Sequence, residues 1–153
     1  MNTVDLTQTQ QDALNTLVAA GRLRRVPVDL AKAGRFLAAA EECLADVKQS
    51  TLHARSRHRL CYDAAHDVVE ALIAGYGYTT TSGSGQHQKL GEAAVALLDA
   101  PPEVALVAQM FDGLRQVRNG DHYTASMITP ASADVAERIA STLLSAARVR
   151  LRP

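Results

Sequence analysis

One short segment of the chain carries side chains that are suited to chemistry on a phosphate. It is the run RQVRNGDHY at residues 115–123, in which Arg115, Arg118, Asn119 and His122 stand at positions i, i+3, i+4 and i+7. On a continuous helix these four positions share one face. The spacing therefore predicts a surface that presents two guanidinium groups, an amide and an imidazole together.

These side-chain types match the needs of a phosphodiester reaction. A guanidinium group binds phosphate oxygens in fixed bidentate geometry and stays charged at any working pH. An imidazole takes up and returns a proton near neutrality. Together they would promote attack of a ribose 2′-hydroxyl on the adjacent phosphate without a metal, and the guanidinium charge would stabilise the transition state. The alternative is a solvated helix end, where the dipole favours arginine.

This segment and its surroundings resemble the HEPN family (higher eukaryotes and prokaryotes nucleotide-binding), which comprises small helical nucleotide- and RNA-binding domains. The family signature is an Arg, a polar residue and, a few positions later, a His, often with a Tyr nearby. The resemblance covers about residues 28–150 and rests on CYDAAHDVVEALIAGYGYTT at 61–80, SGSGQHQKLGEAAVALL at 82–98, and Arg118-Asn119 followed by His122-Tyr123.

The spacing inside the signature leaves two assignments open. Three residues separate Arg118 from His122, which is fewer than the family usually has, whereas six separate Arg115 from His122. Either Arg115 is the catalytic-type arginine, or the segment is a shorter variant that retains Arg118, Asn119 and Tyr123.

The resemblance implies an activity and a set of partners. It implies a homodimer that brings two Arg/His sets to a shared cleft, and a metal-independent endoribonuclease that uses no cofactor. Such proteins are often toxins of toxin–antitoxin or abortive-infection systems. A common partner is a nucleotidyltransferase antitoxin that modifies a tyrosine near the motif, and Tyr123 is the corresponding position here. As an alternative, Tyr123 is a half-buried anchor with its hydroxyl at the rim.

Further polar side chains gather on the helix predicted before this segment. Asp63, His66, Asp67 and Glu70 lie on one side of it. They form either a solvated acidic face or a set that binds substrate and orients the arginines. His87 follows a glycine-rich loop and is expected to cap the next helix, with contact to a ligand as the alternative.

The elements that position these residues are predicted to be helices. Hydrophobic periodicity is helical throughout, over about residues 7–20, 29–48, 51–74, 86–99, 102–119 and 131–150. Asn119-Gly120 is a turn signal, so the fifth helix is expected to end or bend there. Residues 75–85 are expected to be irregular, with a β-branched run too short to make a sheet. The fold class is therefore all-α, a single-domain up-and-down bundle of five to six helices over residues 1–153.

Composition narrows the class of protein further. The 153 residues are 47% hydrophobic and carry 16 basic and 16 acidic groups, a balance that argues against a polybasic nucleic-acid binder. No run approaches the roughly 20 apolar residues of a membrane span, and the polar N-terminus does not resemble a signal peptide. The histidine and cysteine spacings predict no metal site. Cys43 and Cys61 are expected to be reduced and buried, in a cytoplasmic protein.

Three functions remain from the sequence. The first is a ribonuclease acting through His122 with Arg115 or Arg118, for which RNA is the partner. The second is a non-catalytic module that binds RNA or a nucleotide, or docks a partner. The third is a helical scaffold subunit.

Overall fold

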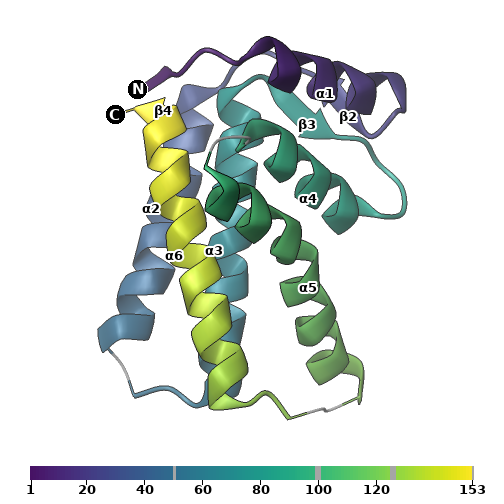
Figure 1. Ribbon diagram of the computed structural model, residues 1–153. Coiled ribbons are helices and arrows are strands. Elements are labelled where there is room, and N and C mark those ends of the chain that lie inside the picture. Colours follow the sequence, from purple (N-terminus) through teal and green to yellow (C-terminus); the bar gives the residue numbers. More distant parts are fainter. Residues whose placement is uncertain (50, 99–100, 125–126, 153) are drawn as a thin grey trace.

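The computed structural model describes residues 1–49, 51–98, 101–124 and 127–152, and of residues 121–124 it describes the backbone (Figure 1). The helices in these ranges are α1 (Gln8–Ala19), α2 (Leu30–Gln49), α3 (Ala54–Gly75), α4 (Gln86–Leu97), α5 (Pro102–Thr124) and α6 (Pro130–Arg150). The strands are β1 (Asn2–Thr3), β2 (Leu23–Arg25), β3 (Tyr78–Thr80) and β4 (Leu151–Arg152). The predicted all-α helical bundle is confirmed.

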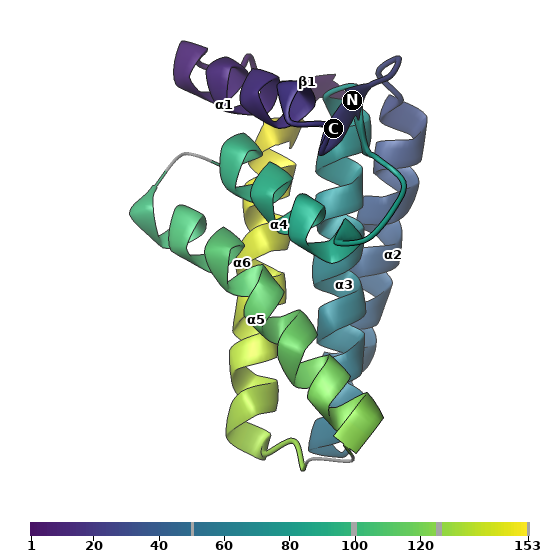
Figure 2. The same cartoon turned by 90° about the vertical axis from the view of Figure 1, so that its right-hand side faces the viewer.

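The central element of the bundle is α3. It packs between α2 and α6, while α4 and α5 lie against another side of it (Figure 2). On α2 the apolar side chains spaced three or four apart face the core: Leu30 is half-buried, and Ala33, Leu37, Ala40, Leu44 and Val47 are buried. Many of the buried side chains of these helices are alanines, and small side chains allow helices to pack closely.

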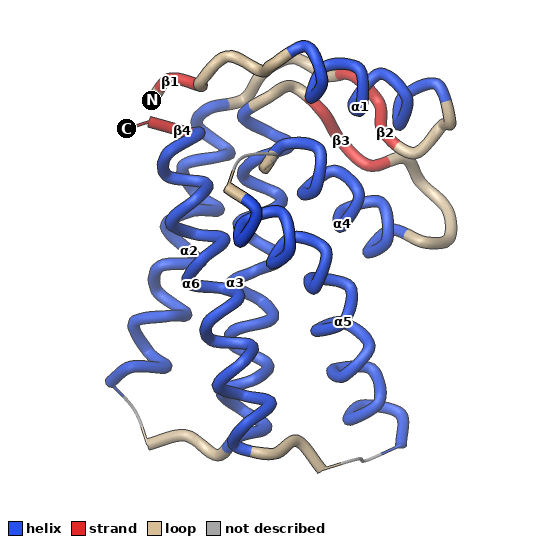
Figure 3. The backbone as a smooth tube through the Cα atoms, in the orientation of Figure 1, coloured by secondary structure: helices blue, strands red, loops and turns tan. Residues whose placement is uncertain are grey.

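Two short antiparallel ribbons stand at the end of the bundle that α1 covers (Figure 3). In one of them β2 pairs with β3, with Leu23 opposite Thr80 and Arg25 opposite Tyr78. In the other, β1 pairs with β4. The prediction that residues 75–85 are too short to make a sheet is therefore wrong. A strand of three residues is too short to show the alternation of apolar and polar residues that predicts a strand. Its partner strand also lies more than fifty positions earlier in the chain.

Local signals in the sequence set several helix ends. Thr7 caps α1 by accepting a hydrogen bond from the Gln10 backbone N–H, and the Thr7 backbone N–H donates in turn to Oε1 of Gln10. Gly21 takes a φ of 71° just past the C-cap of α1, a position where glycine is favoured. Asp29 accepts a hydrogen bond of 2.8 Å from the Lys32 N–H, as expected of a helix cap.

The fifth helix differs from its predicted end. It continues through Asn119 and Gly120 to Thr124, and Gly120 does not adopt a left-handed conformation. The turn signal is overridden because Phe111 and Leu114 anchor the preceding two turns in the core. The helical backbone therefore runs unbroken through the whole predicted motif. Within the described part of the chain, no helix is both long and apolar enough to cross a membrane.

Candidate functional site

Helices α3, α4 and α5 contact one another on one side of the bundle (Figure 2). Five side chains from these three helices come together there. They are Tyr62 and His66 from α3, His87 from α4, and Arg115 and Arg118 from α5, and we refer to them as the Tyr–His–Arg cluster. Two of the predicted catalytic arginines and the predicted binding residue His66 thus come together. Tyr62 and His87 join them.

Tyr62 is at the centre of the cluster and is 3% exposed. Its ring stacks on Phe111, with 6.0 Å between the ring centres and 8° between the planes. Its hydroxyl oxygen lies 2.9 Å from Nδ1 of His87. The guanidinium carbon of Arg118 lies 5.1 Å from the centre of the same ring, a cation–π distance. Burial raises the pKa of Tyr62 and the charge of Arg118 opposes that rise, so the hydroxyl keeps its proton at neutral pH.

The imidazole of His87 faces α3 instead of capping its own helix. Gly85 is the N-cap of α4, and no side chain makes the cap hydrogen bond. The prediction that His87 caps this helix is therefore wrong. The ring is bonded to Tyr62 instead, and its centre lies 6.0 Å from that of His66. Local sequence spacing cannot predict this contact, because Tyr62 and His87 are 25 residues apart in the chain.

The surroundings of His87 favour its neutral form. Burial lowers the pKa of His87, and His66, Arg115 and Arg118 lower it further through their charges. The carboxylate of Asp112 acts in the opposite direction. Because the pKa is lowered from an ordinary value of about 6.5, the uncharged imidazole is the favoured form at pH 7.

His66 lies between two carboxylates of its own helix. Its Nδ1 is 3.8 Å from Asp67 and its Nε2 is 3.9 Å from Glu70, and both contacts become ion pairs when the ring carries a proton. Burial raises the pKa of Asp67, an effect that the charge of His66 opposes. Asp63, a predicted binding residue, is exposed, and its charge raises the pKa of both Tyr62 and Asp67.

The two arginines of the cluster differ in their partners. The Nε–H of Arg115 donates to Asp112 at 2.8 Å, and Gln116 donates to the other oxygen of the same carboxylate at 3.1 Å. No carboxylate among the described residues pairs with Arg118. Its guanidinium stacks on Tyr62 and keeps its N–H donors for another acceptor. Arg118 is therefore the better placed of the two to bind an anion.

The remaining motif residues follow on α5. Asn119 is half-buried next to Arg118. The side chains of His122 and Tyr123 lie outside the described residues, although the backbone at both positions is helical. On that backbone, position 122 is one turn beyond Arg118 and on the same face.

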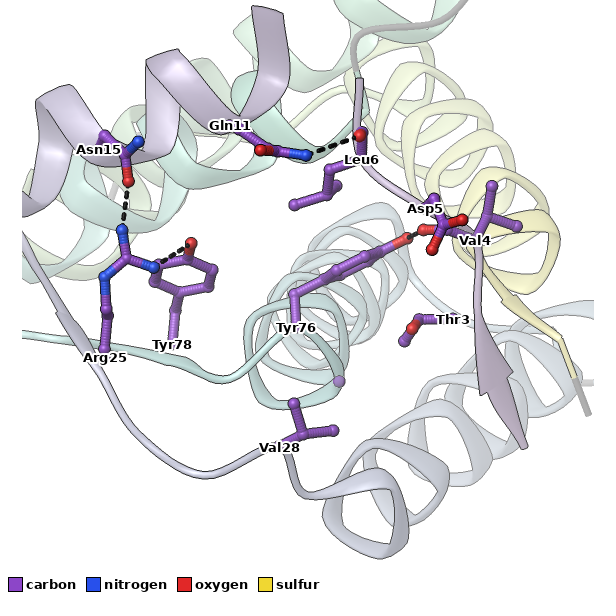
Figure 4. Close-up of a pocket in the computed structure, with 11 residues that line it drawn as sticks. Thr3, Val4, Asp5, Leu6, Gln11, Asn15, Arg25, Val28, Tyr76 and Tyr78 are labelled. Atoms are coloured by element: carbon purple, nitrogen blue, oxygen red, sulfur yellow. Dashed lines mark hydrogen bonds between the residues drawn. The ribbon is translucent and has the colours of Figure 1, made fainter. Parts of the chain in front are cut away.

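A cavity of about 450 Å³ lies at a different place, between α1 and the end of α3 (Figure 4). Several of its polar side chains are hydrogen-bonded within the protein. Arg25 donates to Tyr78 at 3.1 Å and also to Asn15, and the hydroxyl of Tyr76 donates to the Val4 carbonyl at 2.7 Å. We interpret it as the junction that ties the N-terminal segment to the bundle, since these groups are already paired.

No group of three or more His, Cys, Asp or Glu side chains among the described residues is arranged to hold a metal ion. Both cysteines are free thiols. Cys61 is buried as predicted, and burial raises its pKa to about 12. Cys43 is only half-buried, because it lies at the edge of the α2 face that contacts the core.

Compared with protein-family models, with curated proteins and with solved structures, the chain matches none of them. The HEPN resemblance therefore rests on the motif residues themselves, and what it implies is a proposal.

Proposed function

We propose that this chain is a metal-independent endoribonuclease that cuts RNA by attack of a 2′-hydroxyl on the adjacent phosphate. The observation that carries the proposal is the position of Arg118. Its guanidinium lies over Tyr62, without a described carboxylate partner, beside two imidazoles whose ring centres are 6.0 Å apart. A phosphate bound to Arg118 would be within reach of both rings.

The charges of the cluster suit an anionic substrate whose transition state gains negative charge. Arg115 and Arg118 lie one helical turn apart on α5, and both act electrostatically on His87. Arginine pairs of this kind bind phosphate oxygens and stabilise the phosphorane, while imidazoles move the protons. RNA is the substrate class because the reaction takes its nucleophile from the 2′-hydroxyl.

The HEPN resemblance supports a biological setting for the activity. We place the protein among the toxins of toxin–antitoxin or abortive-infection systems, in the cytoplasm, with a nucleotidyltransferase antitoxin that modifies Tyr123. A homodimer through α5 fits the outer face of that helix, where Leu106, Met110 and Val117 are 58%, 41% and 43% exposed.

The test is cleavage of a single-stranded oligoribonucleotide by purified protein in the presence of EDTA. Wild type should release products that end in a 2′,3′-cyclic phosphate. Replacing Arg115 and Arg118 together by Ala should lower the rate by about 10²–10³-fold. The matched control is Arg148→Ala, which removes a guanidinium from an exposed pair with Glu41 and should leave the rate unchanged. Intact RNA with soluble, folded wild type would refute the proposal.

A second function, binding of RNA or a nucleotide without cleavage, is favoured by one observation. Asp112 already neutralises Arg115, which leaves Arg118 as the main phosphate-binding group. This function predicts RNA affinity that falls with rising salt and with Arg118→Ala, and no product at any enzyme concentration.

A further inference from the structure

The two imidazoles of the cluster come from different helices and have different surroundings. His87 of α4 is bonded to a buried tyrosine and lies beside two arginines, whereas His66 of α3 lies between two carboxylates. Their rings meet edge to face, with 60° between the planes and 6.0 Å between the centres. The two rings are close enough together for one phosphodiester to contact both, as proton transfer to and from its oxygens requires.

We propose that the two histidines divide the proton transfers, with His87 as the general base that activates the 2′-hydroxyl and His66 as the general acid that protonates the leaving 5′-oxygen. The inference rests on the ribonuclease activity proposed above and assigns its acid and base.

The bond to Tyr62 occupies Nδ1 of His87, and we assign the role of base to the other nitrogen, Nε2. Nδ1 lies 2.9 Å from the Tyr62 hydroxyl oxygen. When Nδ1 carries the hydrogen and donates it to that oxygen, the lone pair is on Nε2, at the far side of the ring. Tyr62 is in turn held by its stack on Phe111. With His87 in this tautomer, Tyr62 is a positioning residue that orients the ring as the third member of a catalytic triad does.

The surroundings of the two rings fit opposite roles. The uncharged form of His87 is favoured at pH 7, because burial and the charges of His66, Arg115 and Arg118 lower its pKa, with Asp112 alone opposing them. An uncharged ring accepts a proton. The carboxylates 3.8 and 3.9 Å from His66 form ion pairs with it only when it is protonated. A general acid at position 66 would act from that ion-paired form.

The step balances without any co-reactant. Nε2 of His87 takes the proton of the 2′-hydroxyl, the 2′-oxygen bonds to phosphorus, and the bond from phosphorus to the 5′-oxygen breaks. The departing oxygen takes the proton of His66. The products are a 2′,3′-cyclic phosphate and a free 5′-hydroxyl, with His87 protonated and His66 neutral. Exchange with solvent then restores both rings.

The experiment compares two substrates that differ in their need for an acid. One is a single-stranded oligoribonucleotide, whose leaving alkoxide needs a proton. The other is the set of ribonucleoside 3′-(4-nitrophenyl phosphate) esters, whose nitrophenolate departs without one. The variants are His66→Gln and His87→Gln. The matched control is His53→Gln, an exposed histidine at the start of α3 whose side chain makes no cap hydrogen bond.

The proposal expects an asymmetric result. His66→Gln should cut the oligoribonucleotide about 10²–10⁴-fold more slowly than wild type and cleave the aryl esters at nearly the wild-type rate. His87→Gln should be slowed by a similar factor on both substrates, since both need the base. His53→Gln should match wild type. Equal loss on both substrates for the two variants, or no loss for either, would overturn the assignment. Cleavage of the aryl esters by His87→Gln at nearly the wild-type rate would make His87 the acid, and it would also overturn the assignment.

Tyr62→Phe provides a readout that a purely structural role would not change. The ring and its stack on Phe111 are kept, and only the hydroxyl is lost. In wild type the ¹⁵N chemical shifts of His87 should report the Nδ1–H tautomer, and in the variant a mixture of both. The rate should fall on both substrates. A tautomer unchanged by the substitution would contradict the positioning role.

The activity of wild type distinguishes failure of the ribonuclease proposal from failure of the acid–base assignment. If wild type cleaves neither substrate, the ribonuclease proposal fails and the acid–base assignment fails with it. If wild type cleaves both and the glutamine variants do not differ from it, the ribonuclease proposal stands and the acid–base assignment alone is overturned.

Discussion

The continuity of α5 through Gly120 decides whether the motif residues share a face, and a single methyl group tests it. In Gly120→Ala, no described atom lies within 4 Å of the added Cβ, so the substitution changes backbone preference and little else. Gly113, earlier in the same helix, has equally open surroundings. Ala is favoured over Gly in a helix interior by about 0.8–1.0 kcal/mol. Both substitutions should therefore stabilise the protein by nearly that amount.

Gly21→Ala is the matched control because its Cβ also meets no described atom within 4 Å. Gly21, however, has a φ of 71°, where a side chain costs roughly 1–2 kcal/mol. The three Gly→Ala substitutions all have open surroundings, yet the change in the free energy of unfolding should be positive for Gly113 and Gly120 and negative for Gly21.

The assay is thermal unfolding followed by far-UV circular dichroism. For a domain of this size, 1 kcal/mol corresponds to about 2–4 °C in Tm. Gly113→Ala and Gly120→Ala should raise Tm by about that amount, while Gly21→Ala should lower it by about 2–8 °C. Destabilisation by Gly120→Ala comparable to that of Gly21→Ala would show that the chain turns at residues 119–120. The reasoning that brings Arg118 and position 122 onto one face would then be refuted.

Three further predictions concern buried polar groups. Gln10→Ala should destabilise the protein by about 1–3 kcal/mol, measured by urea unfolding, because the buried amide donates to the Leu97 carbonyl at 3.0 Å and that carbonyl would lose its partner. Cys61, with a pKa of about 12, should stay unlabelled by a thiol-specific disulfide reagent at pH 8 in the native state and react fully in urea. Because the pKa of His87 is lowered on folding, its contribution to stability is present above about pH 6.5 and is lost as the pH falls toward the folded-state pKa. Unfolding titrations from pH 7.5 to 5.5 should therefore show a smaller loss of stability for His87→Gln than for wild type.

Much of the fold was predictable because it is built from long amphipathic helices. Leu37, Leu44 and Val47 are spaced three or four apart, and such spacing identifies the buried face of α2 without further information. Short elements were not predictable in this way. Leu23 and Tyr78 are buried in a ribbon of three residues per strand, whose pairing depends on tertiary contact alone.

In the candidate site, too, residues within one helix were predictable from their spacing, and contacts between helices were not. Arg115 and Arg118 could be found from their helical spacing, since both belong to one element. Tyr62 and His66 also carry a local signal, because they stand four residues apart on α3 and so share its face. The role of His87 could not be found, because its hydrogen bond to Tyr62 joins two helices whose relative placement depends on the packing of the whole core.

The backbone of Thr81 joins the start of α4 to a distant part of the chain. Its carbonyl accepts hydrogen bonds from Gln86 and from the buried Lys89, and its hydroxyl donates to the Gly21 carbonyl at 2.6 Å. These contacts fix the first turn of α4, on which His87 stands. A genetic screen for loss of activity should accordingly recover substitutions around residues 21 and 81, far outside the motif. Suppressors of those defects should arise in either segment.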